Sequence, residues 1–500
     1  MLANSQIEIF KKLQSILQGT RNLRSTLGIN NNFFLYPRKL DEFQLKRMKF
    51  LLTRVPKIRI FVYLCHVIIW VPFYVIAHLL WYLIQSFQER SLKTNEAIEV
   101  PLILISHGIM SGKSIKGDSF LSGILSEFSQ ETTYRVLLIP HFRRFKPERI
   151  LDLQDKYEII SRHLSLRQFW ISLAKNLHNS LKLCSMALTA SSLEPLSRTY
   201  LARAARSQLS SGSVTLDQLA INLCLRLDHL HSRKVLIPYE GHALEIAFIT
   251  QIQEKLPEVQ IILFQHSAIA PSQLSFFEGL LLLRNKDSLV VTGELIEKIV
   301  LRYRPEIRNQ LRVLGSDKNI KLIPGIKSIH ERNLSLLITP EASAEAITDM
   351  YETLKFLVPK IDVNALTLRI HPRYEAKQLP NFGSYLGNRL RISDSKLVDD
   401  LSQNSICLYR SSAVVFQSMS VGLIPLYCSR IPPSLLDPLQ LVRFTFPKEV
   451  TNWLFNETRF DNFSEWLRSN PSSLSEILTQ TGTNYFSPLS NECIKWLEGP

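Results

Sequence analysis

From residue 101 onward, the chain repeats one pattern in which a short apolar run is followed by a longer stretch with helical periodicity. Such alternation is typical of a parallel sheet whose strands are joined by crossover helices. It predicts an α/β fold. Nine of the runs are expected to be strands, namely residues 102–106, 135–140, 234–238, 260–265, 288–292, 334–339, 367–370, 405–409 and 424–428.

The length of 500 residues exceeds one ordinary core, since single domains usually hold about 100–200 residues. Residues 316–333 interrupt the periodicity with charged, Pro and Gly residues, so we expect two Rossmann-like lobes, 99–318 and 330–450. Residues 150–232 are rich in Leu, Arg and Ser and predict a helical insertion in the first lobe. We expect residues 451–500 to pack back as a helical tail.

The formal net charge of +15 is concentrated near the N-terminus. Residues 1–59 contain 12 Lys and Arg against 3 Asp and Glu, a net +9, which leaves only +6 for the rest of the chain. Residues 60–84 follow directly and contain no Lys, Arg, Asp or Glu, which is long enough for a helix across ~30 Å of hydrocarbon. Since no recognition motif is present, a basic arm beside an apolar segment favours an anionic membrane surface as partner over nucleic acid.

The apolar segment 60–84 allows three interpretations. It could cross the membrane once, pack as a helix pair in a core, or break near Pro72 into two short helices that dip into one leaflet. The six cysteines are far apart and form no C-x-x-C pair, which argues against a disulfide framework or a zinc knuckle and suits a reducing compartment. We favour the broken segment, with the protein on the cytoplasmic face of the inner membrane.

Candidate catalytic residues follow two predicted strands of the first lobe. Glu240 comes directly after the strand 234–238, and Glu245 is the next acid along the following helix. His266 follows the strand 260–265. Open α/β sheets bind their ligands at the carboxyl ends of the strands, where a carboxylate with a raised pKa can act as a general base and a His can relay a proton. Structural roles in helix capping and strand ending remain the alternatives for these residues.

Candidate anion-binding residues follow two strands of the second lobe. Arg369, His371 and Arg373 surround a His-Pro pair, and two guanidinium groups beside a His suit a phosphate or diphosphate. Ser411 and Ser412 stand at a strand-to-helix turn, where hydroxyl groups and free amides can face an anion. The alternative for Ser411 is a simple helix cap.

These motifs, in this order, resemble the bacterial surface carbohydrate biosynthesis family with GT-B glycosyltransferase architecture. The similarity covers about residues 100–430 and is distantly shared with bacterial sialyltransferases and Kdo transferases, which use CMP-activated sugars without a metal. The residues that carry it are Leu104-Ile105-Ser106, Gly117-Asp118-Ser119-Phe120, Glu240 with Glu245, Gln265-His266-Ser267, Val291-Thr292-Gly293, Val313-Leu314-Gly315, His371-Pro372, Ser411-Ser412 and Gly422-x-x-Pro425.

The resemblance implies a membrane-associated glycosyltransferase of surface polysaccharide biosynthesis. It would move a sugar from a nucleotide donor such as a CMP-sugar, on the side of the second lobe, to a glycan or a lipid-linked glycan on the side of the first lobe, and an inverting outcome is expected. No Asp-x-Asp sequence occurs, so we expect no metal, and no cofactor beyond the donor substrate. Two other functions stay open, a sugar-nucleotide epimerase or hydrolase and a non-catalytic scaffold. Tyr239, where related motifs have a first acid, and Gln417, where many GT-B proteins have a Glu, favour the scaffold.

Overall fold

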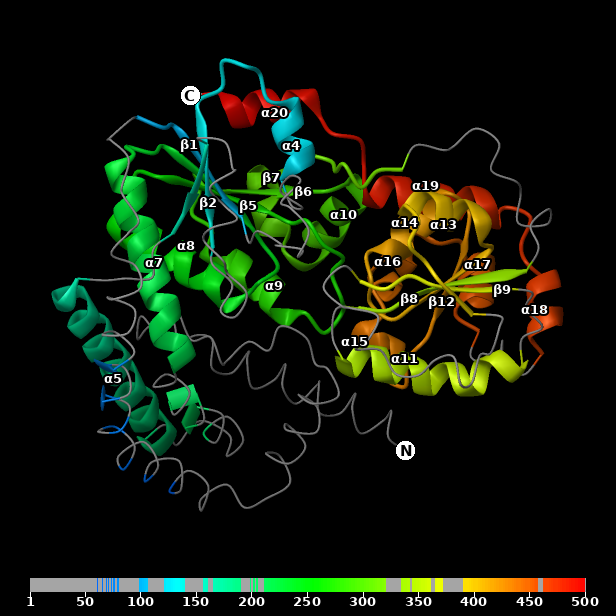
Figure 1. Cartoon of the computed structure of the whole chain (residues 1–500), viewed down its shortest axis with the longest axis horizontal. Helices are drawn as coiled ribbons and strands as arrows, with labels where there is room; N and C mark the ends of the chain where they lie inside the picture. The colour runs from blue at the N-terminus through cyan, green and yellow to red at the C-terminus, as the bar shows by residue number, and fades with distance from the viewer. Residues whose placement is uncertain are drawn as a thin grey trace.

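The strands form where uninterrupted apolar runs can be covered on both faces, as parallel sheets require. The computed structural model describes residues 99–106, 121–139, 156–160, 165–189, 211–320, 334–341, 344–360, 365–371, 390–456 and 462–499, with isolated positions between 61 and 80 and between 198 and 205. Within these residues two separate parallel sheets lie side by side, each flanked by helices (Figure 1). The predicted α/β class with two Rossmann-like lobes is confirmed.

The first sheet has the strand order β3-β2-β1-β4-β5-β6-β7 in the described part of the chain. The order reverses between β1 and β4, which is the doubly wound arrangement. Its strands are β1 (Leu102–Ser106), β2 (Tyr134–Leu138), β3 (Tyr157–Ile159), β4 (Lys234–Pro238), β5 (Gln260–Phe264), β6 (Ser288–Val291) and β7 (Leu311–Val313). The accompanying helices are α4 (Ser122–Glu127), α5 (Leu166–Thr189), α7 (Ser211–His229), α8 (Ala243–Lys255), α9 (Leu274–Gly279) and α10 (Glu294–Tyr303).

The second sheet repeats this plan with the order β10-β9-β8-β11-β12. Its strands are β8 (Ser335–Thr339), β9 (Ala365–Leu368), β10 (Leu390–Ile392), β11 (Ile406–Tyr409) and β12 (Ile424–Tyr427). The helices of this lobe are α11 (Ala344–Leu357), α13 (Leu397–Gln403), α14 (Val414–Ser420), α15 (Pro433–Leu436), α16 (Leu439–Val442), α17 (Lys448–Leu454) and α18 (Phe463–Arg468).

The nine predicted strands all form, with ends shifted by at most two residues. Three further strands, β3, β7 and β10, were not predicted. Each has three residues and lies at the edge of a sheet. One of them, β3, lies inside the stretch 150–232 that we expected to be helical, ahead of α5 and α7.

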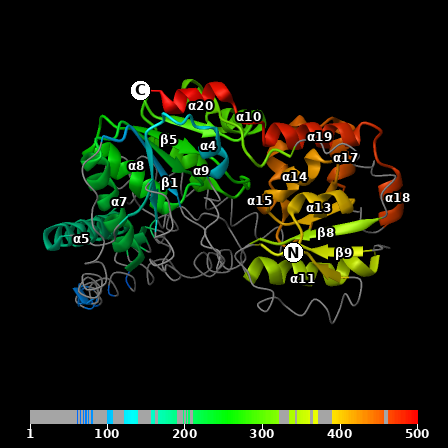
Figure 2. The same cartoon turned by 45° about the horizontal axis from the view of Figure 1, so that its top comes forward.

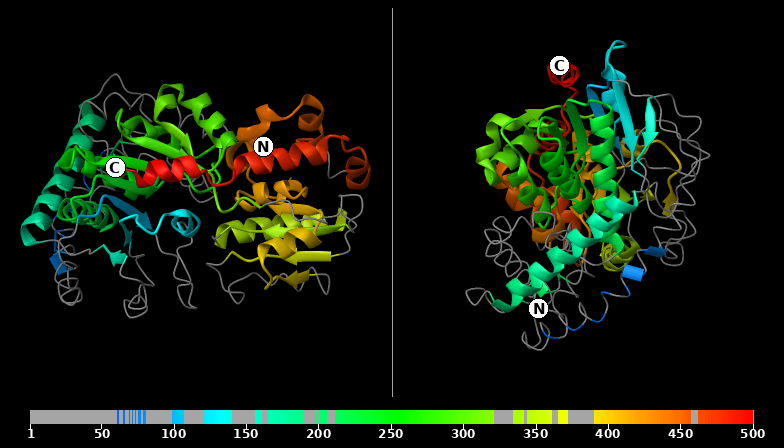
Figure 3. Two further views of the ribbon diagram at one scale, coloured as in Figure 1. Left: turned by 90° about the horizontal axis from the view of Figure 1, so that it is seen from above. Right: turned by 90° about the vertical axis from the view of Figure 1, so that its left-hand side faces the viewer.

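The end of the chain crosses from the second lobe back to the first, above both sheets (Figures 2 and 3). Helix α19 (Leu474–Tyr485) packs on α14, and Gly482 allows the close approach because a Cβ there would lie 2.4 Å from the Phe416 carbonyl oxygen. The Tyr485 ring stacks on Phe416, while its hydroxyl accepts from the backbone N–H of Ile269 in the first lobe at 3.1 Å. Helix α20 (Asn491–Glu498) then packs beside α4.

Of the apolar segment 60–84, only some positions are described, and these are helical. Val75 and Leu79 pack against Phe169 and Leu173 of α5. Pro72, on which the broken-segment interpretation depends, lies outside the described residues. Among the helices that the structure describes, none combines the length and apolar character needed to cross a bilayer.

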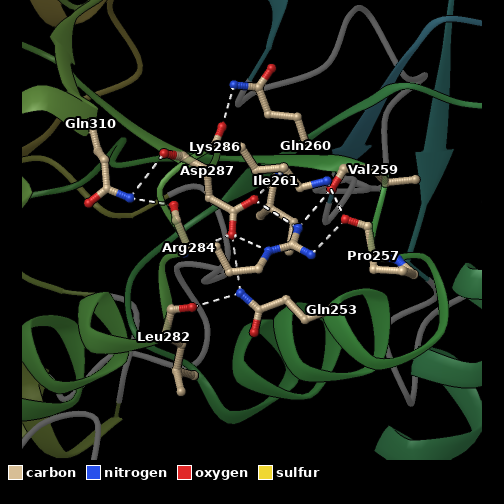
Figure 4. A network of polar contacts seen from close by, with 10 residues as sticks. All are labelled: Gln253, Pro257, Val259, Gln260, Ile261, Leu282, Arg284, Lys286, Asp287 and Gln310. Atoms are coloured by element: carbon tan, nitrogen blue, oxygen red, sulfur yellow. Dashed lines mark hydrogen bonds and ion pairs between the residues drawn. The ribbon is translucent and has the colours of Figure 1, made fainter.

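A buried carboxylate fixes the edge of the first sheet opposite the predicted site (Figure 4). Asp287, fully buried before β6, accepts from the Ile261 N–H at 3.0 Å and from Nε and Nη2 of Arg284 at 2.9 Å each. Gln253 of α8 donates to the same carboxylate at 3.2 Å. Gln253 lies on α8, Ile261 lies at the start of β5, and Arg284 lies with Asp287 in the turn before β6. The Asp287 carboxylate therefore ties these three elements together.

We expect Asp287→Ala to destabilise the protein by about 3 kcal/mol, because it leaves the partly buried Arg284 and the buried Ile261 N–H without their acceptor. Urea unfolding followed by circular dichroism measures the change. The matched control is Glu99→Ala, which removes the exposed ion pair to Arg233 and should cost less than about 1 kcal/mol. Equal losses in the two variants would contradict the structural role of Asp287.

Candidate active site

The first site residues lie together because two adjacent strands are in register. Strands β4 and β5 pair Pro238 with Phe264, so the residues two positions further on, Glu240 and His266, emerge side by side. His266 Nε2 lies 3.2 Å from Glu240 Oε1. Both side chains are about nine-tenths buried, at 10% exposed for Glu240 and 7% for His266. The predicted acid and the predicted His therefore form one cluster.

His242 contacts the same carboxylate from its other side. Its Nε2 lies 3.0 Å from Glu240 Oε2, so the two oxygens of Glu240 each face one imidazole. The turn between the two residues is sharp because Gly241 adopts φ +78°, and a Cβ there would lie 2.4 Å from the Phe276 nitrogen. A carboxylate held between two imidazoles can accept a proton from a hydroxyl and relay it to a neighbouring imidazole.

Glu245 has a different role from Glu240. Its Oε2 accepts from the backbone N–H groups of Glu240 and His242, at 2.8 Å each, in a capping box at the start of α8. Its Oε1 is buried without a hydrogen-bond partner. Burial raises the pKa of Glu245 from 4.5 to about 7; the pull of His242 opposes this rise and the Glu240 carboxylate adds to it. Glu245 thus holds the turn that presents Glu240, through the two backbone N–H groups bound to its Oε2.

Lys318 adds a cation beside this cluster from the connection between the lobes. Its Nζ donates to the backbone oxygen of His266 at 2.6 Å. Burial lowers the pKa of the Lys318 ammonium, and the carboxylates of Asp317 and Glu240 oppose that fall. Gln417 of α14 donates to the Lys318 carbonyl at 3.3 Å, which joins the cluster to the second lobe.

Tyr239 lies on the opposite side of the strand from Glu240. It is fully buried, its hydroxyl donates to the Phe276 carbonyl at 2.7 Å, and its ring packs on the Phe276 ring. Burial raises its pKa well above the ordinary value. Tyr239 is therefore a core residue, and its presence in place of an acid removes nothing from the cluster around Glu240.

A second row of polar residues follows the strands of the second lobe, again because of register. The pairing of Ile338 with Leu368 and of Thr339 with Tyr409 brings Glu341, His371 and Ser411 to neighbouring positions. The Ser411 hydroxyl donates to Glu341, and Arg410 donates to the same carboxylate at 3.0 Å. Ser411 is thus engaged by a carboxylate that sequence analysis did not single out.

Of the other predicted anion-binding residues, Ser412 and Arg369 contact groups of the protein itself. The Ser412 hydroxyl accepts from the Val414 N–H at 3.3 Å, which is a local helix-start contact. Arg369 Nη1 lies 2.7 Å from the buried carboxylate of Asp400. His371 is partly buried, and Arg373 lies outside the described residues. Their role in phosphate binding stays a prediction.

Sequence reasoning missed His242, Lys318 and Glu341. A signal existed for Glu341, because it follows its strand by two positions just as Glu240 follows β4. His242 lies two residues after Glu240 and carried the same kind of signal. Within the described residues, no group of three or more His, Cys, Asp and Glu is arranged to hold a metal ion.

Comparison with known proteins gives similar folds at low identity. No protein-family model matches the chain, and no curated protein does. Similar solved structures include MurG from Acinetobacter baumannii, with 8% identity, a TM-score of 0.47, and coverage of 80% of this chain and 99% of that one. The UDP-GlcNAc 2-epimerase from Neisseria meningitidis bound to UDP-GlcNAc has 11% identity, a TM-score of 0.44, and coverage of 79% and 99%. Identities and TM-scores this low assign neither a reaction nor a substrate to this chain.

We expect Glu245→Gln to flatten the pH dependence of stability. Because the folded-state pKa of about 7 lies above the ordinary 4.5, protonated Glu245 stabilises the fold fully below pH 4.5, and this contribution is lost as the pH rises through about 7. The shift corresponds to on the order of 3 kcal/mol. Unfolding free energies measured across this window test it, with the exposed Glu476→Gln on α19 as control. A slope in Glu245→Gln equal to that of the wild type would contradict the raised pKa.

Proposed function

We propose that this chain is a glycosyltransferase that moves a sugar from a nucleotide-activated donor to a bacterial surface glycan. The observation that carries the proposal is the Glu240 carboxylate, placed between His242 and His266 at the carboxyl ends of β4 and β5. This edge is where open α/β sheets bind ligands. A nearly buried carboxylate with two imidazole neighbours suits deprotonation of an acceptor hydroxyl.

In the proposed reaction the acceptor oxygen bonds to the anomeric carbon while the bond from that carbon to the donor phosphate breaks. The hydroxyl proton passes to Glu240, and His266 and His242 stabilise and orient the carboxylate. Glu245 acts as a positioning residue. A single displacement of this kind inverts the anomeric configuration.

The phosphate charge that leaves with the nucleotide is assigned to the second lobe. His371, Arg369, Arg373, Ser411 and Ser412 are the proposed donor-binding residues, and they would stabilise that charge by preorganised donors. Such binding requires Ser411 to exchange its contact with Glu341, or to share it, when a donor enters.

The acceptor is proposed to be a glycan or a lipid-linked glycan of the capsule, O-antigen or exopolysaccharide type. The basic arm 1–59 and the apolar segment 60–84 support attachment to the anionic cytoplasmic face of the inner membrane. Confinement to that surface raises the local concentration of a lipid-linked acceptor.

A sugar-nucleotide epimerase is the second candidate. It is favoured by the same cluster, because the carboxylate can remove a proton from a sugar carbon and a neighbouring imidazole can return one. Acceptor dependence separates the two functions. Incubation of the protein with radiolabelled nucleotide-sugars, with and without bacterial membranes, yields labelled glycan for a transferase and a new nucleotide-sugar epimer without membranes for an epimerase.

We expect Glu240→Gln to lower the rate of sugar transfer by roughly 10²- to 10⁴-fold, because the amide cannot accept the hydroxyl proton. The measurement is label incorporated into glycan per unit time. Glu258→Gln, an exposed substitution at the opposite end of β5, should keep the wild-type rate. Full transfer by a correctly folded Glu240→Gln protein would refute the assignment of the base.

Nucleotide-sugars should raise the melting temperature of the detergent-purified protein by mass action, and His371→Ala should abolish the shift. A ligand at about 100 times its Kd adds roughly 2.7 kcal/mol to the free energy of unfolding. CMP-, UDP-, GDP- and dTDP-sugars are compared, so that the class that raises the melting temperature identifies the nucleobase of the donor. An unchanged shift in His371→Ala would remove this residue from the donor site.

A further inference from the structure

Helix α5 carries an apolar row on the face turned away from the protein. Leu166, Trp170, Leu181 and Leu188 are 53%, 43%, 52% and 50% exposed. Their spacings of 4, 11 and 7 residues place all four on one side of a helix. Exposed large apolar side chains that occur singly need no explanation, but a row along a whole helix marks an interaction surface.

The inner face of the same helix is already occupied. Phe169, Leu173, Leu183 and Ala187 are buried. Helix α5 contacts α7 on this side, and Phe169 and Leu173 also contact the apolar segment. The outer row is only about half covered by this lobe, where Trp170 contacts the Phe169 ring, and the exposure of the remaining apolar surface to water is a cost that a partner would remove.

The described positions of the apolar segment extend this surface beside α5. Among them, Ile69, Phe73, Ile76 and Leu80 are 57–60% exposed, whereas Val75 and Leu79 face α5. The spacings of 4, 3 and 4 residues again define one helical face. Two outward apolar rows thus lie on elements that contact each other.

The charge of α5 points to the partner. The helix contains Arg167, Lys175 and Lys182 and no Asp or Glu. Lys175 lies 3.5 Å from Glu254 of α8, and the other two have no acidic neighbour within their own helix. Apolar side chains that include a Trp, flanked by basic residues alone, fit the boundary between acyl chains and anionic headgroups. A protein partner of equal fit would need an acidic rim around an apolar groove.

We infer that the outer face of α5 lies on an anionic lipid bilayer, next to the segment 60–84. The apolar row enters the acyl boundary while Arg167 and Lys182 reach headgroup phosphates. Helix α5 spans ~36 Å at about 1.5 Å per residue, so contact along its length fixes the orientation of the first lobe and not only its distance from the membrane. This inference concerns α5, which sequence analysis did not place at a membrane, and it does not depend on the proposed reaction.

The test places an environment-sensitive NBD probe on the full-length protein at Leu181→Cys, in a Cys65→Ser background. The other five cysteines are buried, so the label is confined to the new site. Addition of phosphatidylcholine vesicles containing phosphatidylglycerol should shift the emission to the blue and increase it several-fold. Pure phosphatidylcholine vesicles, or high salt, should weaken the response. The same probe at Phe356→Cys on α11, which is 71% exposed in the second lobe, should not respond.

Two results would overturn the inference. If the protein floats with the vesicles but the probe at residue 181 does not respond, the segment 60–84 attaches the protein without α5. If the probe shifts without vesicles and in proportion to protein concentration, a second copy of the chain covers this face.

A paired substitution gives an independent measure. Leu181→Glu with Leu188→Glu should lower partitioning onto the anionic vesicles by at least about tenfold, because two half-exposed leucines no longer enter the acyl boundary. Phe356→Glu is the matched control and should partition as the wild type does. Circular dichroism verifies that each variant is folded, and unchanged partitioning of the folded paired variant would refute the role of α5.

Discussion

The register of parallel strands is the constraint on which the polar clusters depend. Pairing of Pro238 with Phe264 sets Glu240 beside His266, and pairing of Thr339 with Tyr409 sets Glu341 beside Ser411. A slip of one residue would turn each of these side chains to the other face of its sheet. Because the strands are buried on both faces, such a slip would draw the polar residues that bound each apolar run into the interior, and this cost opposes it. The chemistry at the strand ends is thus fixed by hydrophobic packing well away from it.

The cluster around Glu240 also shows how the fold supports a poorly solvated acid. One carboxylate oxygen of Glu245 accepts the two hydrogen bonds that hold the turn, and the side chain remains buried. Because burial disfavours the charged carboxylate, it raises the pKa of Glu245. The opposite edge of the same sheet, where Asp287 has its full set of donors, is electrostatically satisfied. A raised pKa and an unsatisfied buried oxygen thus occur together at Glu245, at the carboxyl end of β4, as expected where a protein binds a ligand.

Much of the fold could be predicted from the sequence because the interior strands have four or five residues that are mostly apolar. The edge strands β3, β7 and β10 could not, since three residues with one open side carry almost no pattern. For the site, Glu240 and His266 were predicted from their places after strands. Lys318 was not, because its position depends on how the connection between the lobes folds back over β5. Likewise, the engagement of Arg369 by Asp400 is a tertiary contact without a local signal.

The two lobes are joined twice, and the two connections run next to each other. Ser316 donates its N–H to the Ser487 carbonyl at 2.8 Å, so the outgoing connection after β7 is bonded to the returning one after α19. Tyr485 anchors this junction on both sides, through its ring and its hydroxyl. A paired connection of this kind permits bending of the lobes about one axis and restricts rotation about others. Twisting one lobe against the other would break the Ser316–Ser487 hydrogen bond and the two contacts of Tyr485.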